Sequence, residues 1–369
     1  MDFTPTEGQQ DLEQLTRTIV EKLTSNERQR ELDALPARFD EPLWRALAEA
    51  GVLASTLPEN VGGNDLGVLE QTTVLRELGR QLAAVPYLPS IVLGAATLAR
   101  YGNDDQREFA RRAGTGADIL TAALAEEANY EPSRPVTRAD LTDGHWSLTG
   151  TKITVPVADR AARILVPAAT DAGVAVFLVD PTADGVTVAA HDVVDHTPEF
   201  IVELGGVAGD LIGSVEQGAE ILDFLLARAA VGLTASQLGT LERSLELVGD
   251  YARERIQFDR PIGSFQAVAQ RLADAYIDVK GVRLALTQAA WLLSEDLPAD
   301  QEANTAKFWA ADAGHRVAHT VIHVHGGVGL DRDHPVHRYF LAAKHNEFAL
   351  GSATDQLRRL GASLAATPA

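Results

Sequence analysis

The chain has 369 residues, of which 46% are hydrophobic and 23% charged, ordinary values for a globular protein that exclude wholesale disorder and a fibrous repeat. Its 32 basic and 52 acidic residues give a formal charge of −20, which repels nucleic acid and anionic lipid, so an anionic ligand needs a local basic cluster. The absence of cysteine excludes disulfides, a thiolate nucleophile and a sulfur-ligated metal.

The N-terminal segment, residues 1–5, lacks a basic stretch followed by an apolar one, so it is not typical of a secretory signal. No part of the sequence approaches 18 uninterrupted apolar residues, and we expect no membrane-spanning segment. Together with the lack of cysteine, these features predict a cytoplasmic protein.

The first third of the chain has a helical pattern. The apolar residues of the first segment recur every three or four positions, at Leu12, Leu15, Ile19 and Leu23. Asp40 is placed to cap a helix over residues 41–50, and further helices are predicted over 68–82 and 89–101. We therefore predict an N-terminal all-α domain over residues 1–118.

From residue 119 the pattern changes to short extended segments separated by turns. Residues 146–155 are typical of a β-hairpin strand, and residues 164–167 and 174–179 are typical of a second hairpin joined by a turn. Several strands at this spacing predict a middle β domain over residues 119–215, folded as a small barrel or sandwich.

The helical period returns from residue 216 and continues to the end of the chain. Long helices with narrow apolar seams are predicted around residues 238–252, 268–282 and 303–323. Such helices pack as an antiparallel bundle, and seams on more than one side leave surface for a partner subunit. We predict a C-terminal four-helix bundle over residues 216–369, which makes the whole fold α+β.

A basic cluster stands out in this acidic chain. Within residues 251–266 one helix ends and another begins, and Arg253, Arg255 and Arg260 lie close together. Guanidinium groups suit pyrophosphate because their paired donors match its oxygens. The same pattern is also typical of a solvated helix end, and the charges alone leave both interpretations open.

A glycine-rich stretch follows a predicted helix at residues 323–329. Gly326, Gly327 and Gly329 would let a ligand approach the backbone closely and would expose N–H donors to phosphate. A glycine cap followed by a turn is the structural alternative.

Together the two stretches resemble the C-terminal half of the acyl-CoA dehydrogenases. The shared motifs are Arg255-x-Gln257-Phe258-x-x-Pro261-Ile262-x-x-Phe265-Gln266, His325-Gly326-Gly327-x-Gly329 and His334-Pro335-x-x-Arg338. Residues 43–51, 58–63 and 77–79, and Leu148-x-Gly150-x-Lys152 in the β part, are similar to the same family. The resemblance covers essentially the whole chain and implies a helical domain, a β domain and a helix bundle in that order.

The resemblance implies a flavoprotein that oxidises an acyl-CoA thioester to the 2,3-enoyl-CoA. In this family a carboxylate removes the proton beside the thioester carbonyl, the neighbouring carbon passes hydride to N5 of FAD, and an electron-transferring flavoprotein accepts the electrons. A second subunit holds the adenosine pyrophosphate half of FAD. Carried over by position, these contacts fall on Arg255, Gln257, Phe258, Gln266, His323, Gly326 and Gly327. His323 replaces the usual glutamine, and Asp259 stands where glycine is common.

The catalytic base of the family is missing. Its two known positions fall on Leu350 and Ala229, neither of which accepts a proton, and a general base contributes roughly 10²- to 10⁴-fold in rate. Ile153 also replaces the aromatic residue of the flavin-covering strand, so this chain's own isoalloxazine pocket is degraded. The sequence thus resembles the base-lacking subunit of the α2β2 acyl-CoA dehydrogenases of actinobacterial steroid catabolism, whose base-bearing partner acts on cholesterol side-chain CoA thioesters.

Other interpretations stay open. Glu347, about one helical turn before Leu350, could be a relocated base in an active homo-oligomer, or the chain could be a scaffold that contacts neither flavin nor acyl-CoA. Two histidine pairs have ligand-like spacing on a helix: His315 with His319, and His334 with His337. No Glu-x-x-His motif accompanies them, so we expect no metal. Lys152 could face a phosphate, but we expect it to be a solvent-exposed side chain.

Overall fold

The computed structural model describes residues 3–35 and 37–366; Met1 and Asp2 of the N-terminal segment lie outside the described residues. The chain forms two compact units. The bundle unit comprises Met1–Arg30, Thr72–Ala83 and Ala230–Ala369, and the sheet unit comprises Glu31–Gln71 and Ala84–Ala229. Each unit is thus built from segments that are far apart in the sequence.

The first part of the chain is helical, as its apolar periodicity predicts. The helices are α1 (Glu7–Leu23), α2 (Asn26–Asp33), α3 (Glu41–Glu49), α4 (Val52–Ser55), α5 (Val68–Arg80), the π-helical η2 (Leu88–Ala95), α6 (Ala96–Tyr101) and α7 (Asp104–Gly114). The predicted cap is confirmed, because the Asp40 side chain accepts a hydrogen bond from the Leu43 N–H at 3.4 Å. The segment expected as one helix over 89–101 instead begins with π-type turns.

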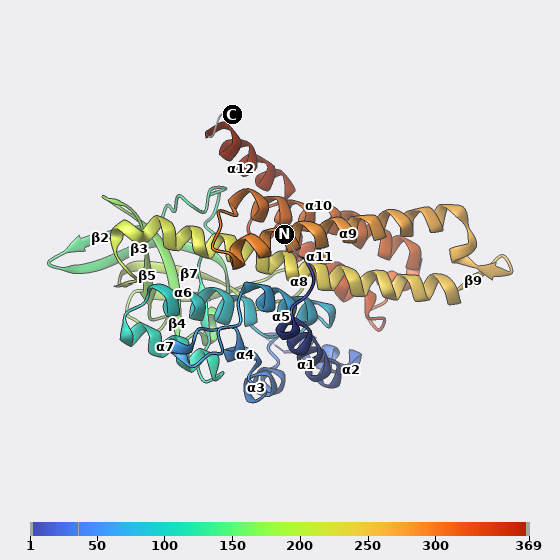
Figure 1. Ribbon diagram of the computed structural model, residues 1–369, viewed down its shortest axis with the longest axis horizontal. Helices are drawn as coiled ribbons and strands as arrows, with labels where there is room; N and C mark the ends of the chain where they lie inside the picture. Colours follow the sequence, from blue (N-terminus) through green and yellow to red (C-terminus); the bar gives the residue numbers. More distant parts are fainter. Residues whose placement is uncertain (1–2, 36, 367–369) are drawn as a thin grey trace. The chain divides into compact units, whose positions relative to one another are not determined.

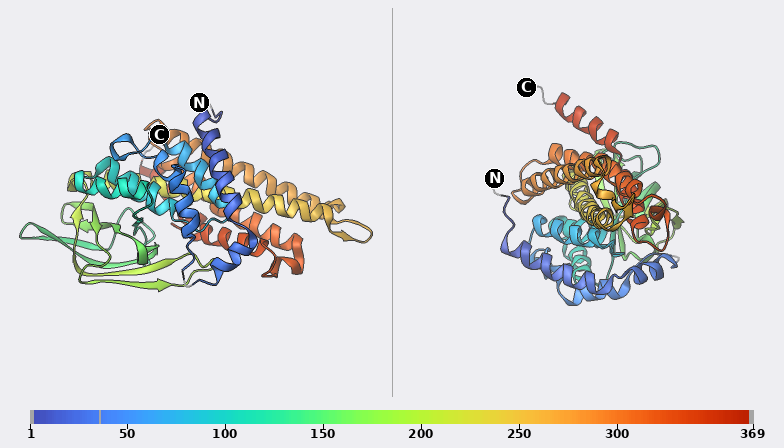
Figure 2. Two further views of the ribbon diagram at one scale, coloured as in Figure 1. Left: turned by 90° about the horizontal axis from the view of Figure 1, so that it is seen from below. Right: turned by 90° about the vertical axis from the view of Figure 1, so that its right-hand side faces the viewer.

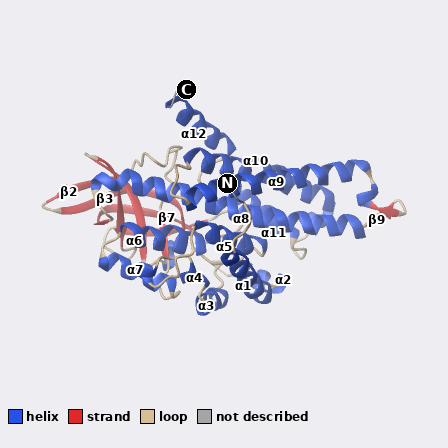
Figure 3. Cartoon of the chain, in the orientation of Figure 1, coloured by secondary structure: helices blue, strands red, loops and turns tan. Residues whose placement is uncertain are grey.

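Eight strands follow and form one curled sheet (Figure 3). They are β1 (Leu120–Ala122), β2 (Arg138–Thr142), β3 (His145–Pro156), β4 (Arg163–Thr170), β5 (Gly173–Val179), β6 (Val186–His191), β7 (Glu199–Ala208) and β8 (Asp210–Leu211). Their order is β6-β7-β3-β2-β4-β5-β8, with β1 beside β4. The β4–β5 hairpin is confirmed by the pairing of Thr170 with Gly173. The hydrophobic core of the sheet includes Leu148, Val166, Phe177 and Val202, all fully buried.

The last part of the chain is a helix bundle. It contains α8 (Gly218–Glu254), α9 (Gln266–Ser294), α10 (Asp300–His325), the 3-10 turn η6 (Gly326–Leu330), α11 (Val336–Phe348) and α12 (Ala353–Ala366). Helices α8 and α9 run side by side and are joined by a hairpin of β9 (Ile256–Gln257) and β10 (Arg260–Pro261), as Figures 1 and 2 show. The predicted order of helices, β structure and helix bundle is therefore confirmed, whereas the three domain boundaries stay a prediction.

Glycines allow the helices of the bundle unit to cross closely. A Cβ atom at Gly239 of α8 would lie 1.9 Å from the Arg76 carbonyl oxygen of α5, and one at Gly79 would lie 2.2 Å from the Ser236 carbonyl oxygen. Both distances are far below any real Cβ contact. The crossing of α5 and α8 therefore requires small residues on both helices.

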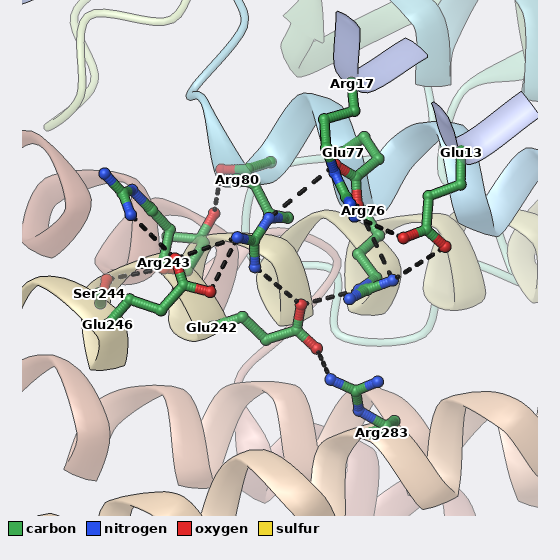
Figure 4. A network of polar contacts seen from close by, with 12 residues as sticks. Glu13, Arg17, Arg76, Glu77, Arg80, Glu242, Arg243, Ser244, Glu246 and Arg283 are labelled. Atoms are coloured by element: carbon green, nitrogen blue, oxygen red, sulfur yellow. Dashed lines mark hydrogen bonds and ion pairs between the residues drawn. The ribbon is translucent and has the colours of Figure 1, made fainter. Parts of the chain in front are cut away.

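A network of ion pairs joins α1, α5, α8 and α9 in the bundle unit (Figure 4). Its central group is Glu242, whose side chain is 6% exposed and contacts three arginines from two other helices: Arg76 at 2.7 Å, Arg80 at 3.3 Å and Arg283. Arg17 of α1 binds Glu77 of α5 at 2.9 Å. Several guanidinium groups thus share one buried carboxylate, which offsets the cost of removing it from water.

Helix α8 is unusually apolar. Among the described residues, the segment Val215–Glu254 is the one helix long and apolar enough to cross a membrane, with a window of mean hydropathy 1.4. Of that window, 61% is buried inside the protein. This burial is typical of the core helix of a folded domain, which passes the same test of length and composition.

Candidate functional site

The basic cluster lies on the hairpin that links α8 to α9. Strands β9 and β10 pair Gln257 with Arg260, which leaves Phe258 and Asp259 as a two-residue turn with φ values of +53° and +62°. Positive φ at both positions is typical of a type I′ turn, which favours Asn, Asp and Gly. Asp259 suits this turn, which gives a backbone reason for its presence where glycine is common. For Phe258, a positive φ is a strained backbone conformation.

All seven residues predicted to contact FAD are exposed. On the hairpin, the Phe258 side chain is 87% exposed. Arg255 has no ion-pair partner among the described residues, whereas Arg253 binds Asp250 and Arg260 lies over the Phe265 ring at 4.1 Å. Of the three, Arg255 and Arg260 thus have no carboxylate partner among the described residues, and Arg255 has no ring contact either, which leaves its guanidinium available to an anion.

The glycine stretch lies where α10 ends. Gly326 has φ +61° and ψ −135°, and a Cβ atom at Gly326 or Gly327 would meet nothing within 4 Å. The Tyr251 ring of α8 stacks on the His325 ring of α10 at 4.4 Å between centroids, and its hydroxyl donates to the His325 carbonyl oxygen at 3.4 Å. The structure thus brings the last turns of α8 and α10 together, and with them the base of the hairpin and the glycine turn.

These residues fit a dinucleotide cofactor. The unpaired guanidinium of Arg255 offers donors that a pyrophosphate needs. The open space at Gly326 and Gly327 lets such a ligand approach the backbone closely, although the Gly326 N–H already donates to the carbonyl oxygens of Ile322 and His323. The exposed Phe258 ring offers an apolar face beside them. Gln257 and Gln266 add amide groups, although the Gln257 side chain donates to the Ile256 carbonyl oxygen at 2.7 Å. The arrangement can bind and orient a phosphate-containing ligand, and neither family position of the catalytic base lies in it.

The first position of the missing base, Leu350, lies in a firmly held turn between α11 and α12. The Arg359 guanidinium and the Gln356 amide both donate to the Leu350 carbonyl oxygen at 3.0 Å. The Lys307 ammonium donates to the carbonyl oxygens of Asn346, Glu347 and Gly351 at 3.0, 3.2 and 3.3 Å. Burial, and then the Arg359 charge, lower the pKa of Lys307 to about 7. The turn therefore has a rigid backbone and an aliphatic side chain at the position of the base.

The second position, Ala229, is buried on α8 in the sheet unit. The side chain before it, Arg228, lies over the Phe224 ring at 4.1 Å. No carboxylate occupies either position, as the sequence shows.

Glu347, the candidate for a relocated base, is already engaged. Its carboxylate accepts from the Lys344 ammonium at 2.5 Å and lies 3.2 Å from the His315 imidazole. The side chain is buried. A carboxylate paired with a lysine and facing α10 is arranged to hold two helices together rather than to abstract a proton.

Lys152 corrects one expectation. The sequence predicts an exposed lysine, but its side chain is 1% exposed and its ammonium lies 2.7 Å from the Glu126 carboxylate. Glu126 also accepts from the backbone N–H groups of Val136 and Thr137 at 2.6 and 2.8 Å. Burial opposes ionisation of both groups, but the lysine charge and these hydrogen bonds lower the pKa of Glu126 to about 2. Side chains alternate between the two faces along β3, and Lys152, like Leu148, is on the buried face instead of the solvent face.

The segment after Lys152 is strained. Thr154 and Val157 have φ values of +49° and +46°, which are outliers for β-branched residues. The Ile153 N–H donates to the Ala125 carbonyl oxygen at 3.0 Å. The sequence patterns did not predict this backbone strain, the buried position of Lys307 or the stacking of Tyr251. For Lys307 a signal exists, because a lysine between apolar residues of a helix, as in Ala306-Lys307-Phe308, indicates a buried cation.

The histidine pairs do not form a metal site in the part of the chain that the structure describes, where no group of three or more His, Cys, Asp or Glu side chains could hold an ion. The His315 and His319 rings lie 4.4 Å apart. His337 instead donates through Nδ1 to the His334 carbonyl oxygen at 2.7 Å.

Comparisons with known proteins agree with this architecture. Residues 6–111 match the N-terminal domain of acyl-CoA dehydrogenases and residues 216–365 match their C-terminal domain. An acyl-CoA dehydrogenase of Mycobacterium tuberculosis, FadE27, is 53% identical, with both chains covered completely. The helical domain, curled sheet and helix bundle, in this order, define a flavin-dependent oxidoreductase of the acyl-CoA class. The chain belongs to the acyl-CoA dehydrogenase family, whose members bind FAD.

Two solved structures are also very similar. The ChsE4-ChsE5 complex from Mycobacterium tuberculosis contains a chain that is 54% identical with a TM-score of 0.95, both chains being covered completely. The Tcur3481-Tcur3483 steroid ACAD contains a chain that is 37% identical with a TM-score of 0.93, with 98% of this chain and 99% of that chain covered.

Proposed function

We propose that this chain is the base-lacking subunit of a heteromeric acyl-CoA dehydrogenase and that it completes the FAD site of a homologous, base-bearing partner. The observation that carries this proposal is an asymmetry. The seven positions for FAD contacts are exposed, with Arg255 unpaired, whereas both positions for the base hold hydrocarbon side chains, Leu350 and Ala229. Two similar structures carry names that support a heteromer and a steroid substrate.

The reaction removes a proton and a hydride from adjacent carbons of an acyl-CoA. FAD supplies the hydride acceptor when bound. In the proposed α2β2 assembly, Arg255 binds the pyrophosphate, which lies against the side-chain-free backbone at Gly326 and Gly327. Phe258, Gln257, Gln266 and His323 contact the adenosine half. The partner's glutamate takes the α-proton. We infer a steroid side-chain CoA thioester from cholesterol catabolism as the substrate, an electron-transferring flavoprotein as the electron acceptor and the cytoplasm as the location.

The proposal is tested by producing this chain alone and together with an acid-bearing homologue. We expect the lone chain to form no enoyl-CoA, because no base is present, and the mixed assembly to hold one FAD per pair of unlike subunits. Flavin absorbance and enoyl-CoA formation are the measurements. Two flavins per pair, or fast desaturation by the lone chain, would contradict the proposal.

A second variant separates FAD binding from scaffolding. Arg255→Ala is expected to weaken FAD binding to the assembly about tenfold in Kd, which corresponds to the loss of about 1.4 kcal/mol and is read as a lower FAD content at limiting FAD. Arg253→Ala is the matched control, because Arg253 is equally exposed but already paired with Asp250. Equal FAD content in the two variants would identify a scaffold subunit without flavin contact.

A further inference from the structure

His325, directly before the glycine turn, is buried with one nitrogen unpaired. Its residue is 3% exposed. The Nδ1 atom lies 2.8 Å from the Val321 carbonyl oxygen, and because a carbonyl only accepts, Nδ1 carries the proton. The Nε2 atom is therefore an acceptor in the neutral ring, and it has no hydrogen-bond partner among the described residues. A buried acceptor without a donor is uncommon in folded proteins.

His334 has the complementary arrangement. The backbone N–H of Val336 donates to its Nδ1 at 3.3 Å, so Nδ1 is unprotonated and the proton of the neutral ring is on Nε2. The rings of His325 and His334 lie 5.2 Å apart between centroids, with an angle of 57° between their planes. At this separation a small ring rotation, or one bridging water, can join the donor of His334 to the unpaired acceptor of His325.

We propose that the neutral His334–His325 pair shares one proton between its two Nε2 atoms, directly or through one water, and thereby positions the Gly326–Gly327 turn for FAD. The positioning step rests on the proposed function, because it assumes that this turn binds the cofactor. His325 is a positioning residue in this proposal: its buried side chain does not contact FAD but fixes the Gly326–Gly327 backbone that follows it. The histidine pair extends the proposed function, because it makes the affinity for FAD depend on pH.

Protonation breaks the pair for a simple reason. A second proton on His325 puts two N–H groups face to face, and one on His334 puts Nδ1–H against the Val336 N–H. Burial lowers the pKa of both rings below the usual 6.5. The His334 charge lowers the pKa of His325 further, against the hydrogen bond to Val321, and the His337 charge lowers that of His334. The other titratable groups facing the pair are Tyr251 of α8, Asp331, which favours protonation of His334, and His337 of α11. The pair is therefore neutral near pH 7 and fails only when the pH falls through the lowered pKa values of the two rings.

The first test needs no cofactor. In the full chain labelled with ¹⁵N-histidine, NMR at pH 7.5 is expected to show the Nδ1–H tautomer for His325 and the Nε2–H tautomer for His334. In the His334→Gln variant the His325 resonances are expected to shift. The opposite tautomer at either ring, or unchanged His325 resonances in that variant, overturns the pairing.

The second test measures FAD affinity of the mixed assembly by equilibrium dialysis between pH 7.5 and 5.5. We expect about a tenfold loss of affinity in the parent and a clearly smaller loss in His325→Gln, because glutamine can donate to the Val321 carbonyl and accept from His334 without titrating, so that only His334 still gains a proton. His145→Gln, a change at an exposed histidine of the sheet unit, should follow the parent. If His325→Gln keeps the parent's pH dependence, the positioning role is wrong.

The two proposals fail in different ways. If Arg255→Ala retains FAD as the parent does, the proposed function fails. The NMR test of the tautomers then still decides whether His325 and His334 are hydrogen-bonded. If Arg255→Ala loses FAD but the tautomers differ from those expected, the proposed function stands and the histidine pair is rejected.

Discussion

At the scale of single residues, buried charges decide where the backbone of the site lies. Lys307 is fully buried and donates to three carbonyl oxygens at the end of α11. Two of those carbonyls, of Asn346 and Glu347, belong to the last turn of α11, which has no partners of its own for them, and the third, of Gly351, lies in the turn that follows. The lysine therefore fixes the turn that carries Leu350.

Replacing Lys307 by methionine tests this role. Methionine is unbranched and only one atom shorter than lysine, but it leaves the three carbonyls without their donor, so we expect the free energy of unfolding to fall by about 2 kcal/mol. Urea denaturation is the measurement. Lys280→Met, at an exposed lysine of α9, is the matched control and should change stability by less than about 0.5 kcal/mol. Equal effects for both variants would exclude the role.

Glu126 gives a prediction about pH. Its folded pKa of about 2 lies below the unfolded value of 4.5, so the stabilisation is fully present above pH 4.5 and is lost as the pH falls toward 2. Glu126→Gln leaves Lys152 buried without its partner and is expected to cost about 3 kcal/mol at pH 7. It should also flatten the acid dependence between pH 4.5 and 2, as followed by denaturation curves. A variant with the parent's acid dependence would contradict the assignment. Glu131→Gln, at an exposed glutamate of the same loop, is the control.

At the scale of secondary-structure elements, small residues and a strained turn set the geometry. The hairpin between α8 and α9 holds Phe258 in a left-handed conformation with its ring in solvent. The strained backbone and the exposed ring do not stabilise an isolated chain. A contact between the Phe258 ring and FAD, which is the role proposed for it, explains both.

The crossing of α5 and α8 depends on Gly239. Gly239→Ala places a methyl group where only 1.9 Å separates it from the Arg76 carbonyl oxygen, so the helices must move apart. We expect the loss of packing to outweigh the gain in helix propensity and to lower stability by about 2 kcal/mol, measured by urea denaturation. Gly361→Ala on α12, where nothing lies within 4 Å, should be neutral or slightly stabilising. A neutral Gly239→Ala would show that the crossing is not closely packed.

At the scale of the whole molecule, segments far apart in the sequence are joined by charge. Glu242 of α8 is bound by Arg76 and Arg80 of α5 and by Arg283 of α9. Because the carboxylate is buried, its loss leaves three guanidinium groups without their shared partner. The bundle unit is therefore held together by a polar centre as well as by apolar seams.

Glu242→Gln is expected to destabilise the bundle unit by about 3 kcal/mol, since a neutral amide cannot balance the three arginine charges. Hydrogen exchange of α5 and α8 amides reports the effect locally, and urea denaturation reports its size. Glu21→Gln, at an exposed position of α1, is the control. If the two variants have the same stability, the network contributes little.

The amino-acid sequence by itself determined the order of the elements and the missing base. Apolar periodicity is a local property, so the helices over residues 7–23 and 266–294 and the β4–β5 hairpin followed from it. The identity of Leu350 and Ala229 is visible without any structure, because a hydrocarbon side chain has no proton acceptor in any fold.

Only the tertiary structure decided which distant groups meet. Lys152 was expected at the surface, yet the pairing of β3 turns it toward Glu126, 26 residues earlier in the chain. The stacking of Tyr251 on His325 and the three carbonyls around Lys307 likewise join helices that no local pattern relates. Hydrogen bonds and burial at such contacts depend on how elements pack, which is a long-range property, whereas periodicity records only which face of each element is apolar.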